Sequence, residues 1–167
     1  RTEERPAMLY KAEDEPLREV SWQELYDKTK AIAHFLREQG VQPGDRVVAY
    51  LPHIPETIMA FLACASLGAV WSSCSPDFGS PSVLDRFQQI EPKVLIAVDG
   101  YRWNGKIFDR LKTVAELQAS LPTLEKTILV TLVTDGSQVD GLENPILWER
   151  ALDISASATT FDFEQVP

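Results

Sequence analysis

Apolar residues recur along this chain in short runs, separated by segments in which they follow helical spacing. Four runs of strand length, at 46–51, 69–73, 93–98 and 127–133, are rich in apolar residues. Runs of this kind are typical of strands that helices cover on both faces, because neither face then has to be polar. The four runs therefore predict the strands at the centre of a sheet.

The segments between these runs predict helices. Ser21 and Glu24 have capping-box spacing, and apolar residues repeat at near-helical intervals as far as Gly40, which predicts a helix over 22–39. Pro55 suits the first turn of a second helix. Alternation of strands and helices favours right-handed crossovers, and so predicts the α/β class, with a mostly parallel sheet and helices on both faces. The remaining predicted elements are helices at 55–67, 80–90 and 106–119, a short helix near 147–151, and a short N-terminal hairpin from 7–11 and 17–20.

The length and composition allow one sizeable core, since 44% of the 167 residues are apolar. Residues 1–133 are predicted to form an N-terminal α/β subdomain. Residues 134–167, rich in turn signals and small polar residues, are predicted to be an irregular connector. Because the chain begins with Arg1, we interpret it as a partial domain, whose surface exposed by truncation could favour self-association.

Charge and cysteine content narrow the classes of partner. A formal net charge of -9 argues against nucleic acid or an anionic membrane as a partner, because the field would repel both. Cys64 and Cys74 form no paired motif and lie in apolar segments, which indicates reduced, buried thiols. The sequence shows no signal peptide, and its longest apolar run, 58–71, is too short to span a membrane. These features predict a cytoplasmic protein with small-molecule ligands.

Two loops follow predicted strands at the edge where open parallel sheets bind ligands, namely 74–80 and 99–106. In the second loop Arg102 and Lys106 supply positive charge, and Trp103 offers a flat apolar surface. This mixture suits an adenine nucleotide that carries a phosphate. The simpler alternative is a solvated basic loop whose aromatic residues cover the edge of the sheet.

Other familiar chemistry has little support in the sequence. His34 and His53 are far apart and show no spacing typical of a metal site or a catalytic triad. Neither a serine-hydrolase elbow nor a glycine-rich dinucleotide or triphosphate loop occurs. We therefore assign no catalytic residue and no metal ligand within this chain.

Several segments resemble landmarks of the adenylate-forming superfamily. They are Ser21-Trp-Gln-Glu-Leu, Gly40-Val-Gln-Pro-Gly-Asp-Arg-Val, Pro55-Glu-Thr and Leu67-Gly-Ala-Val. The segment Trp71-Ser-Ser-Cys-Ser-Pro-Asp-Phe-Gly79 and the 99–106 loop resemble those of short-chain acyl-CoA synthetases, especially synthetases that activate acetoacetate. The resemblance covers most of the chain and implies the first part of a large adenylation domain.

The resemblance also implies binding roles. It places Arg102 and Lys106 on the phosphates of coenzyme A, with Trp103, Asn104 and Gly105 shaping the loop, and makes Ser75, Pro76, Asp77 and Phe78 a wall of the nucleotide site. This chain differs from the pattern of acetyl-CoA synthetases at Pro76-Asp77, where two glycines would be expected.

The activity implied by the resemblance is an ATP-dependent acid-thiol ligase. Acetoacetate would react with ATP to give an acyl-adenylate and pyrophosphate, with magnesium assisting, and coenzyme A would then take the acyl group. Acetate or propionate is the alternative acid, and a non-catalytic nucleotide-binding or scaffold module is the alternative class. The triphosphate loop and the later catalytic elements of the family would follow Pro167, so we predict that this chain alone is inactive and requires no cofactor.

Overall fold

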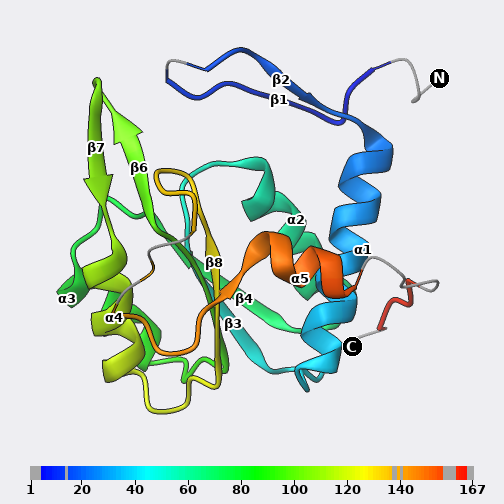
Figure 1. Ribbon diagram of the computed structural model, residues 1–167. Coiled ribbons are helices and arrows are strands. Elements are labelled where there is room, and N and C mark those ends of the chain that lie inside the picture. Colours follow the sequence, from blue (N-terminus) through cyan, green and yellow to red (C-terminus); the bar gives the residue numbers. More distant parts are fainter. Residues whose placement is uncertain (1–4, 14, 137–138, 140, 156–160, 165–167) are drawn as a thin grey trace.

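The chain folds into layers, with helices on both sides of a parallel sheet (Figure 1). The structure is a computed structural model that describes residues 5–13, 15–136, 139, 141–155 and 161–164. Its helices are α1 (Trp22–Glu38), α2 (Pro55–Ser66), α3 (Ser80–Gln88), α4 (Leu111–Ser120) and α5 (Trp148–Ile154). Its strands are β1 (Met8–Tyr10), β2 (Arg18–Val20), β3 (Arg46–Tyr50), β4 (Val70–Cys74), β5 (Val94–Val98), β6 (Gly100–Trp103), β7 (Lys106–Asp109), β8 (Lys126–Val130) and β9 (Ile146–Leu147).

Five strands form one sheet in the order β4-β3-β5-β8-β9, and every neighbouring pair is parallel. Val48 of β3 lies between Ser72 of β4 and Leu95 of β5, and Ile96 of β5 lies beside Ile128 of β8. The sheet predicted from the four apolar runs is confirmed. The predicted N-terminal hairpin is also confirmed, since β1 and β2 pair antiparallel outside this sheet.

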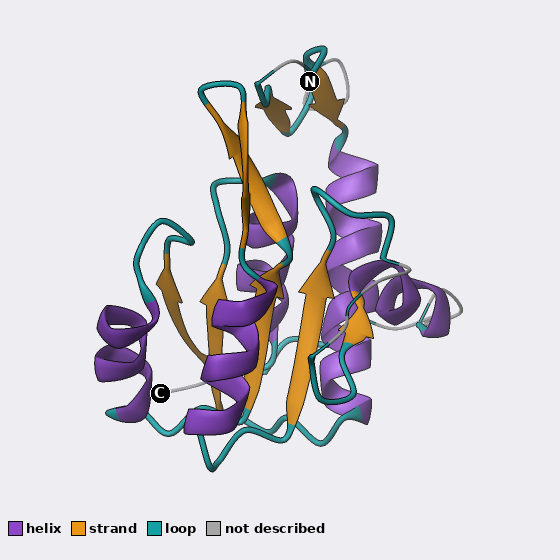
Figure 2. Ribbon diagram, turned by 60° about the vertical axis from the view of Figure 1, so that its left-hand side comes forward, coloured by secondary structure: helices purple, strands orange, loops and turns teal. Residues whose placement is uncertain are grey.

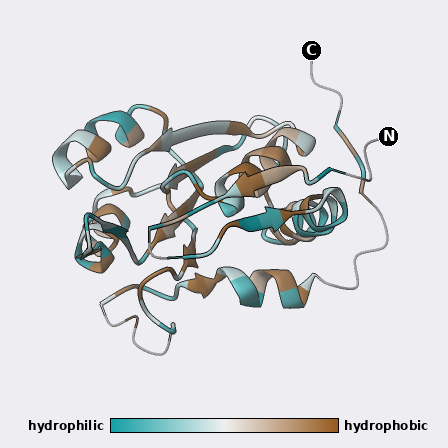
Figure 3. Ribbon diagram, turned by 90° about the horizontal axis from the view of Figure 1, so that it is seen from above, coloured by the Kyte–Doolittle hydropathy of each residue, from teal (hydrophilic) through white to brown (hydrophobic). Residues whose placement is uncertain are grey.

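Both faces of the sheet are covered, which explains why its strands read as apolar runs. Val47 and Ala49 pack on the side of α1, α2 and α5, whereas Val48 and Tyr50 pack on the side of α3 and α4. All four side chains are fully buried. Figure 2 shows the two helical layers, and Figure 3 shows apolar residues concentrated where the strands and helices meet. The prediction of helices on both faces is therefore confirmed.

The prediction of a helix over 106–119 is wrong for its first residues. Lys106–Asp109 is strand β7, which pairs antiparallel with β6, and α4 begins only at Leu111. Asn104 and Gly105 form the turn between these strands with φ of 51° and 70°. A tight hairpin turn of this kind needs positive φ at both central residues, which Asn and Gly adopt most readily. The predicted loop is thus a hairpin that projects beyond the carboxyl edge of the sheet (Figure 2).

Part of the segment predicted to be an irregular connector contributes to the core. Strand β9 adds to the edge of the sheet beside β8, and α5 buries Trp148 and Ala151 against the layer of α1 and α2. The short helix predicted near 147–151 is confirmed as α5. Positions 137–138, 140, 156–160 and 165–167 of this segment lie outside the described residues.

Strand β4 forms the opposite edge of the sheet, and apolar side chains are exposed beside it. Val70 is 49% exposed, and Ile58 and Phe61 of α2 are each 43% exposed. The Phe61 ring lies edge-on to Trp71 of β4, with 6.1 Å between the ring centroids. An unpaired strand edge next to apolar side chains favours association. Self-association through this surface stays a prediction.

An ion pair at the amino edge of the sheet predicts how stability depends on pH. Asp45 accepts hydrogen bonds from the Gln42 amide at 2.9 Å and from the Lys93 ammonium at 3.0 Å. Burial alone would raise the pKa of Asp45, but these contacts outweigh it and lower that pKa below its usual 3.8. A carboxyl whose pKa is lower in the folded state stabilises the fold above its unfolded pKa, and this contribution is lost as the pH falls through the folded pKa.

We therefore expect the urea concentration at half-unfolding to decrease as the pH is lowered from about 6 to about 3. In Asp45→Asn this decrease should be smaller. Because Asn keeps the size of the side chain, the comparison isolates the charge. An equal loss in both proteins would assign the acid sensitivity to other carboxyls.

Candidate functional site

A pocket of about 660 Å³ opens at the carboxyl edge of the sheet. Its walls come from the β1–β2 connection, the residues after β3 and β4, strand β6, the end of β8 and the start of α5. The neighbouring strands β3 and β5 are followed by helices on opposite faces of the sheet: α2 follows β3, and α4 follows β5 after the β6–β7 hairpin. Ligands of open α/β sheets bind at such a switch point, outside the carboxyl ends of the strands.

Hydrogen bonds from Tyr50 of β3 hold the loop after β4. The hydroxyl of this buried tyrosine lies 2.8 Å from the carbonyl oxygens of both Pro76 and Phe78. Burial raises the pKa of Tyr50 to about 12, although the positive charge of Arg110 opposes the rise. The hydroxyl therefore stays protonated at neutral pH and remains a donor to the loop.

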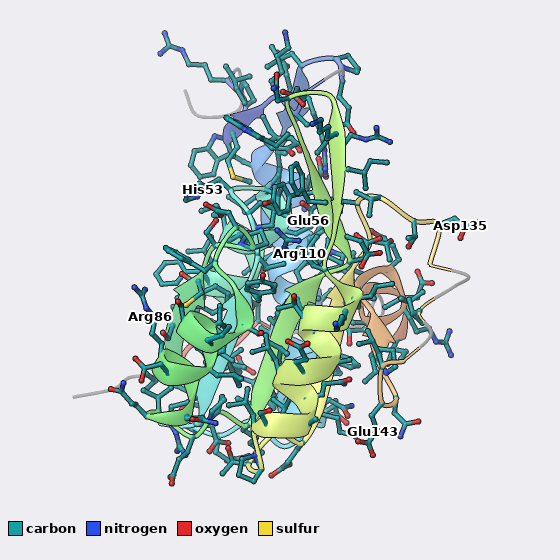
Figure 4. The ribbon with its side chains drawn as sticks, turned by 90° about the vertical axis from the view of Figure 1, so that its left-hand side faces the viewer. His53, Glu56, Arg86, Arg110, Asp135 and Glu143 are labelled. Carbon is teal, nitrogen blue, oxygen red and sulfur yellow. The ribbon has the colours of Figure 1, made fainter. Side chains whose placement is uncertain are left out.

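Arg110 joins the same loop to the β6–β7 hairpin. Its Nε donates to the Pro76 carbonyl at 2.6 Å, and one of its terminal nitrogens donates to the Tyr101 hydroxyl at 3.1 Å. The guanidinium also lies over the rings of Tyr101 and Phe108, at 5.0 and 5.9 Å from their centroids. Figure 4 shows Arg110 at the base of the hairpin. Arg110 is thus a positioning residue, whereas the sequence analysis assigned it no role.

Three of the four residues predicted to form the wall of the nucleotide site lie at the pocket, and Phe78 does not. Ser75, Pro76 and Asp77 line the pocket, but Phe78 does not, and its ring faces the Arg86 guanidinium at 5.3 Å. The Ser75 hydroxyl donates to the Asp77 carboxylate. This hydrogen bond lowers the pKa of Asp77, so the side chain carries a negative charge in the pocket at neutral pH. A negative charge at this wall disfavours phosphate beside it.

The hairpin carries the other predicted residues. Arg102 and Trp103 line the pocket, and both are exposed, whereas Lys106 is exposed outside it. Trp103 lies opposite Lys106 in the strand register, and Arg102 lies opposite Ile107. Because successive side chains of a strand point to opposite faces, Arg102 and Lys106 extend from opposite faces of the hairpin.

The tip of the hairpin contacts a residue that the sequence analysis did not single out. The backbone N–H groups of Asn104 and Gly105 donate to the two carboxylate oxygens of Glu13, at 2.8 and 3.0 Å. Glu13 belongs to the connection between β1 and β2, which lies beside the hairpin tip (Figures 1 and 2). Since Glu13 and Trp103 both line the pocket, this contact joins two of its walls.

The other side of the β1–β2 hairpin is held by Arg18. Its guanidinium donates to Glu24 of α1 at 2.8 Å and to Glu56 of α2 at 3.2 Å. Arg18 lines the pocket, and so does Glu56, but their charges are already paired. Arg102 is thus a pocket cation without an ion pair among the described residues.

Asp99, which directly follows β5, supports the site although it does not line the pocket. Its fully buried carboxylate accepts hydrogen bonds from the amides of Leu132, Val133 and Thr134, the shortest at 2.7 Å, and from the Thr134 hydroxyl at 2.8 Å. These contacts hold the residues after β8, of which Leu132 lines the pocket. From the sequence, Asp99 was predicted only as the start of the 99–106 loop.

The histidines lie apart in the structure. His53 is exposed at the pocket, and the Nδ1 atom of His34 is buried without a hydrogen-bond partner among the described residues. No group of three His, Cys, Asp or Glu side chains in the described part of the chain is arranged to hold a metal ion. None of the helices described there is long and apolar enough to cross a membrane.

Comparison with known proteins connects this architecture to a family. Residues 1–156 match the family described as "AMP-binding enzyme". The chain is 48% identical to acetoacetyl-CoA synthetase from Streptomyces lividans, whose structure superposes with a TM-score of 0.88 over 97% of this chain and 24% of that one. This chain is also 37% identical to acetoacetyl-CoA synthetase of Macaca fascicularis, in a match that covers 95% of this chain. It is 44% identical to acetoacetyl-coenzyme A synthetase of Rhizobium meliloti strain 1021, in a match that covers 78% of this chain.

The matches cover nearly all of this chain but a small share of its relatives. The chain spans about a quarter of the length of the Macaca protein and a fifth of the Rhizobium one. The resemblance seen in the sequence is confirmed, and it concerns one part of a larger enzyme.

Proposed function

Because this chain belongs to the AMP-binding enzyme family, we propose that it is part of the adenylation domain of an acetoacetate-CoA ligase. The whole protein would join acetoacetate to ATP with release of pyrophosphate. The thiol of coenzyme A would then take the acyl group from the adenylate. The observation that carries this proposal is the 48% identity to the Streptomyces lividans synthetase over 97% of this chain, at a TM-score of 0.88.

We assign the coenzyme A contacts of this chain to the β6–β7 hairpin. Arg102 and Lys106 are the proposed phosphate contacts, and their positions on opposite faces of the hairpin suit two different phosphate groups of one ligand. Coenzyme A carries both a diphosphate and a separate 3′-phosphate. Trp103 is 69% exposed and offers a flat apolar surface next to these cations.

The loop after β4 supplies shape rather than phosphate binding. Tyr50 and Arg110 fix its backbone, while the negative charge of Asp77 keeps phosphate away from that wall. Ser75 and Pro76 therefore suit the sugar or base of a nucleotide. Magnesium is proposed for adenylate formation, and we assign none of its ligands to residues of this chain.

The proposed location is the cytoplasm. Both cysteines are free and buried, and burial raises the pKa of Cys64 to about 12, so this thiol stays protonated and unreactive at neutral pH. Unpaired thiols are usual in a reducing compartment.

Exchange of pyrophosphate into ATP tests the proposed activity. In the intact protein we expect acetoacetate to support faster exchange than acetate or propionate, and we expect the 167-residue chain alone to give none above background. Exchange that requires acetate or propionate instead would assign another acid. Nucleotide binding without exchange on any acid would favour a non-catalytic module.

A further inference from the structure

Helix α2 is apolar on two opposite faces. One face packs into the core of the domain. The opposite face is exposed, and its apolar residues recur at helical spacing: Ile58, Phe61, Leu62 and Ala65. The only charged residue of the helix is Glu56, in its first turn. A helix that is apolar all round is typical of a position between two layers, not of a surface.

The exposed face of α2 continues onto β4. Val70 is exposed at the start of this strand, and Trp71 lies edge-on to Phe61. Among the described strands none pairs with the outer edge of β4, so its backbone N–H and C=O groups are open to a further strand. We call this surface the α2 face, made of Ile58, Phe61, Leu62, Ala65, Val70 and Trp71.

Residues 161–164 lie against α1. The Phe161 ring is edge-on to the Tyr26 ring, with 5.5 Å between the centroids, and Phe161 packs against the core. The Arg37 guanidinium, further along α1, donates to the Asp162 carbonyl at 3.4 Å. These contacts hold the chain to the helix on its way out of the domain.

At residue 164 the chain reaches the end of α2. The Glu164 N–H donates at 2.8 Å to the carbonyl of Ser66, the last residue of α2, shortly before β4 begins at Val70. Residue 164 therefore lies near the amino end of the open edge of β4. A chain that runs from there along the edge has the direction of β4, and every neighbouring pair of this sheet is parallel. This direction leads back to the edge of the sheet where the pocket opens.

We propose that in the intact protein the segment following Pro167 adds to the sheet as a strand parallel to β4, that its side chains cover the α2 face, and that the contact between Tyr26 and Phe161 holds the start of this segment in place. The inference rests on the proposed function only for the length of the intact protein, since this chain spans about a quarter of its relatives. A segment tethered beside Ser66 has a high effective concentration at the α2 face, which favours it over a second copy of the protein.

The experiment measures how fast a maleimide labels single thiols in the intact protein. Ala65→Cys places a thiol on the α2 face at little change in size, and Ser82→Cys places one on exposed α3, on the other side of the sheet. Both native cysteines of this chain are buried, and the unchanged protein gives the background. We expect the thiol at position 65 to react about tenfold or more slowly than that at position 82 in the folded protein, and at the same rate in urea.

Tyr26→Ala in the Ala65→Cys protein tests the anchoring contact. Loss of the ring contact with Phe161 should raise the labelling rate at position 65 about three- to tenfold, because the covering segment opens more often. Trp22→Ala is the matched control, since Trp22 is an exposed aromatic residue one turn earlier on α1 and has no ring contact with a described residue. It should leave the rate unchanged.

Three results would overturn the inference. Equal labelling at positions 65 and 82 in the folded protein would show that the α2 face is open. Labelling at position 65 that slows only as the protein concentration rises would assign the cover to a second copy. Unchanged labelling in Tyr26→Ala would remove the anchoring role of the ring contact. Pyrophosphate exchange with acetoacetate reads the ligase activity separately, so slow labelling without exchange would leave this inference standing while the ligase proposal failed.

Discussion

Replacing Asp99 by alanine is expected to lower the free energy of unfolding by about 2 to 4 kcal/mol, the largest loss among the substitutions considered for this chain. The buried carboxylate accepts hydrogen bonds from three consecutive amides and one hydroxyl after β8. Alanine leaves these donors without their acceptor. Urea unfolding followed by circular dichroism measures the loss.

Asp109→Ala is the matched control. Asp109, the last residue of β7, is an exposed aspartate whose carboxylate accepts one hydrogen bond from the described residues, from the Leu111 amide at 3.0 Å. We expect a much smaller loss from this variant, since water replaces an exposed acceptor readily. Similar losses in both variants would show that water satisfies the amides after β8 as well as Asp99 does.

Replacing Arg102 or Lys106 by alanine in the intact protein is expected to raise the apparent Michaelis constant for coenzyme A about tenfold, because a charge-assisted hydrogen bond to phosphate contributes about 1.5 to 3 kcal/mol. Adenylate formation, measured by pyrophosphate exchange, should survive. Because the two side chains leave opposite faces of the hairpin, their effects should multiply in the double variant.

Lys112→Ala serves as the control for this pair, since Lys112 is an exposed cation on α4 outside the pocket. A parallel fall of both half-reactions in Arg102→Ala would indicate that the residue supports the fold. If neither the Michaelis constant for coenzyme A nor the rate of pyrophosphate exchange changed, Arg102 and Lys106 would be ordinary solvated charges.

The central sheet could be predicted from sequence because burial on both faces leaves a direct pattern. Val47 to Tyr50 and Val94 to Val98 are apolar in succession, and only a covered strand tolerates that. Strand β9 could not be predicted in this way, since its two residues are too few to form a pattern. Its pairing depends on α5, whose buried Trp148 anchors the segment.

The hairpin carried a signal that the sequence analysis did not use. Asn104-Gly105 is the most favoured pair for a two-residue turn, and the residues before it, Tyr101 to Trp103, alternate aromatic and polar side chains. Two strands would have placed Arg102 and Lys106 on opposite faces from the outset. The predicted helix instead placed Lys106 at a helix start.

The contacts that build the site were beyond sequence reasoning for a different reason. Arg110 reaches a carbonyl 34 positions away, and Glu13 reaches amides more than 90 positions away. Such contacts depend on how separate elements pack, and neither residue stands in a motif. The guanidinium of Arg110 bridges the loop after β4 and the hairpin, which its position in the sequence does not indicate.

Among the strands that the structure describes, β6 and β7 pair only with each other, so no ladder hydrogen bonds join the hairpin to the five-stranded sheet. Substitutions at its tip can therefore change what binds there without loosening the sheet. At its base this freedom ends: a methyl group on Gly100 would lie 2.7 Å from both the Phe108 carbonyl and the Val133 side chain. Residues 102, 103 and 106 of the hairpin are thus open to substitution without a cost to the sheet, while residue 100 is confined to glycine.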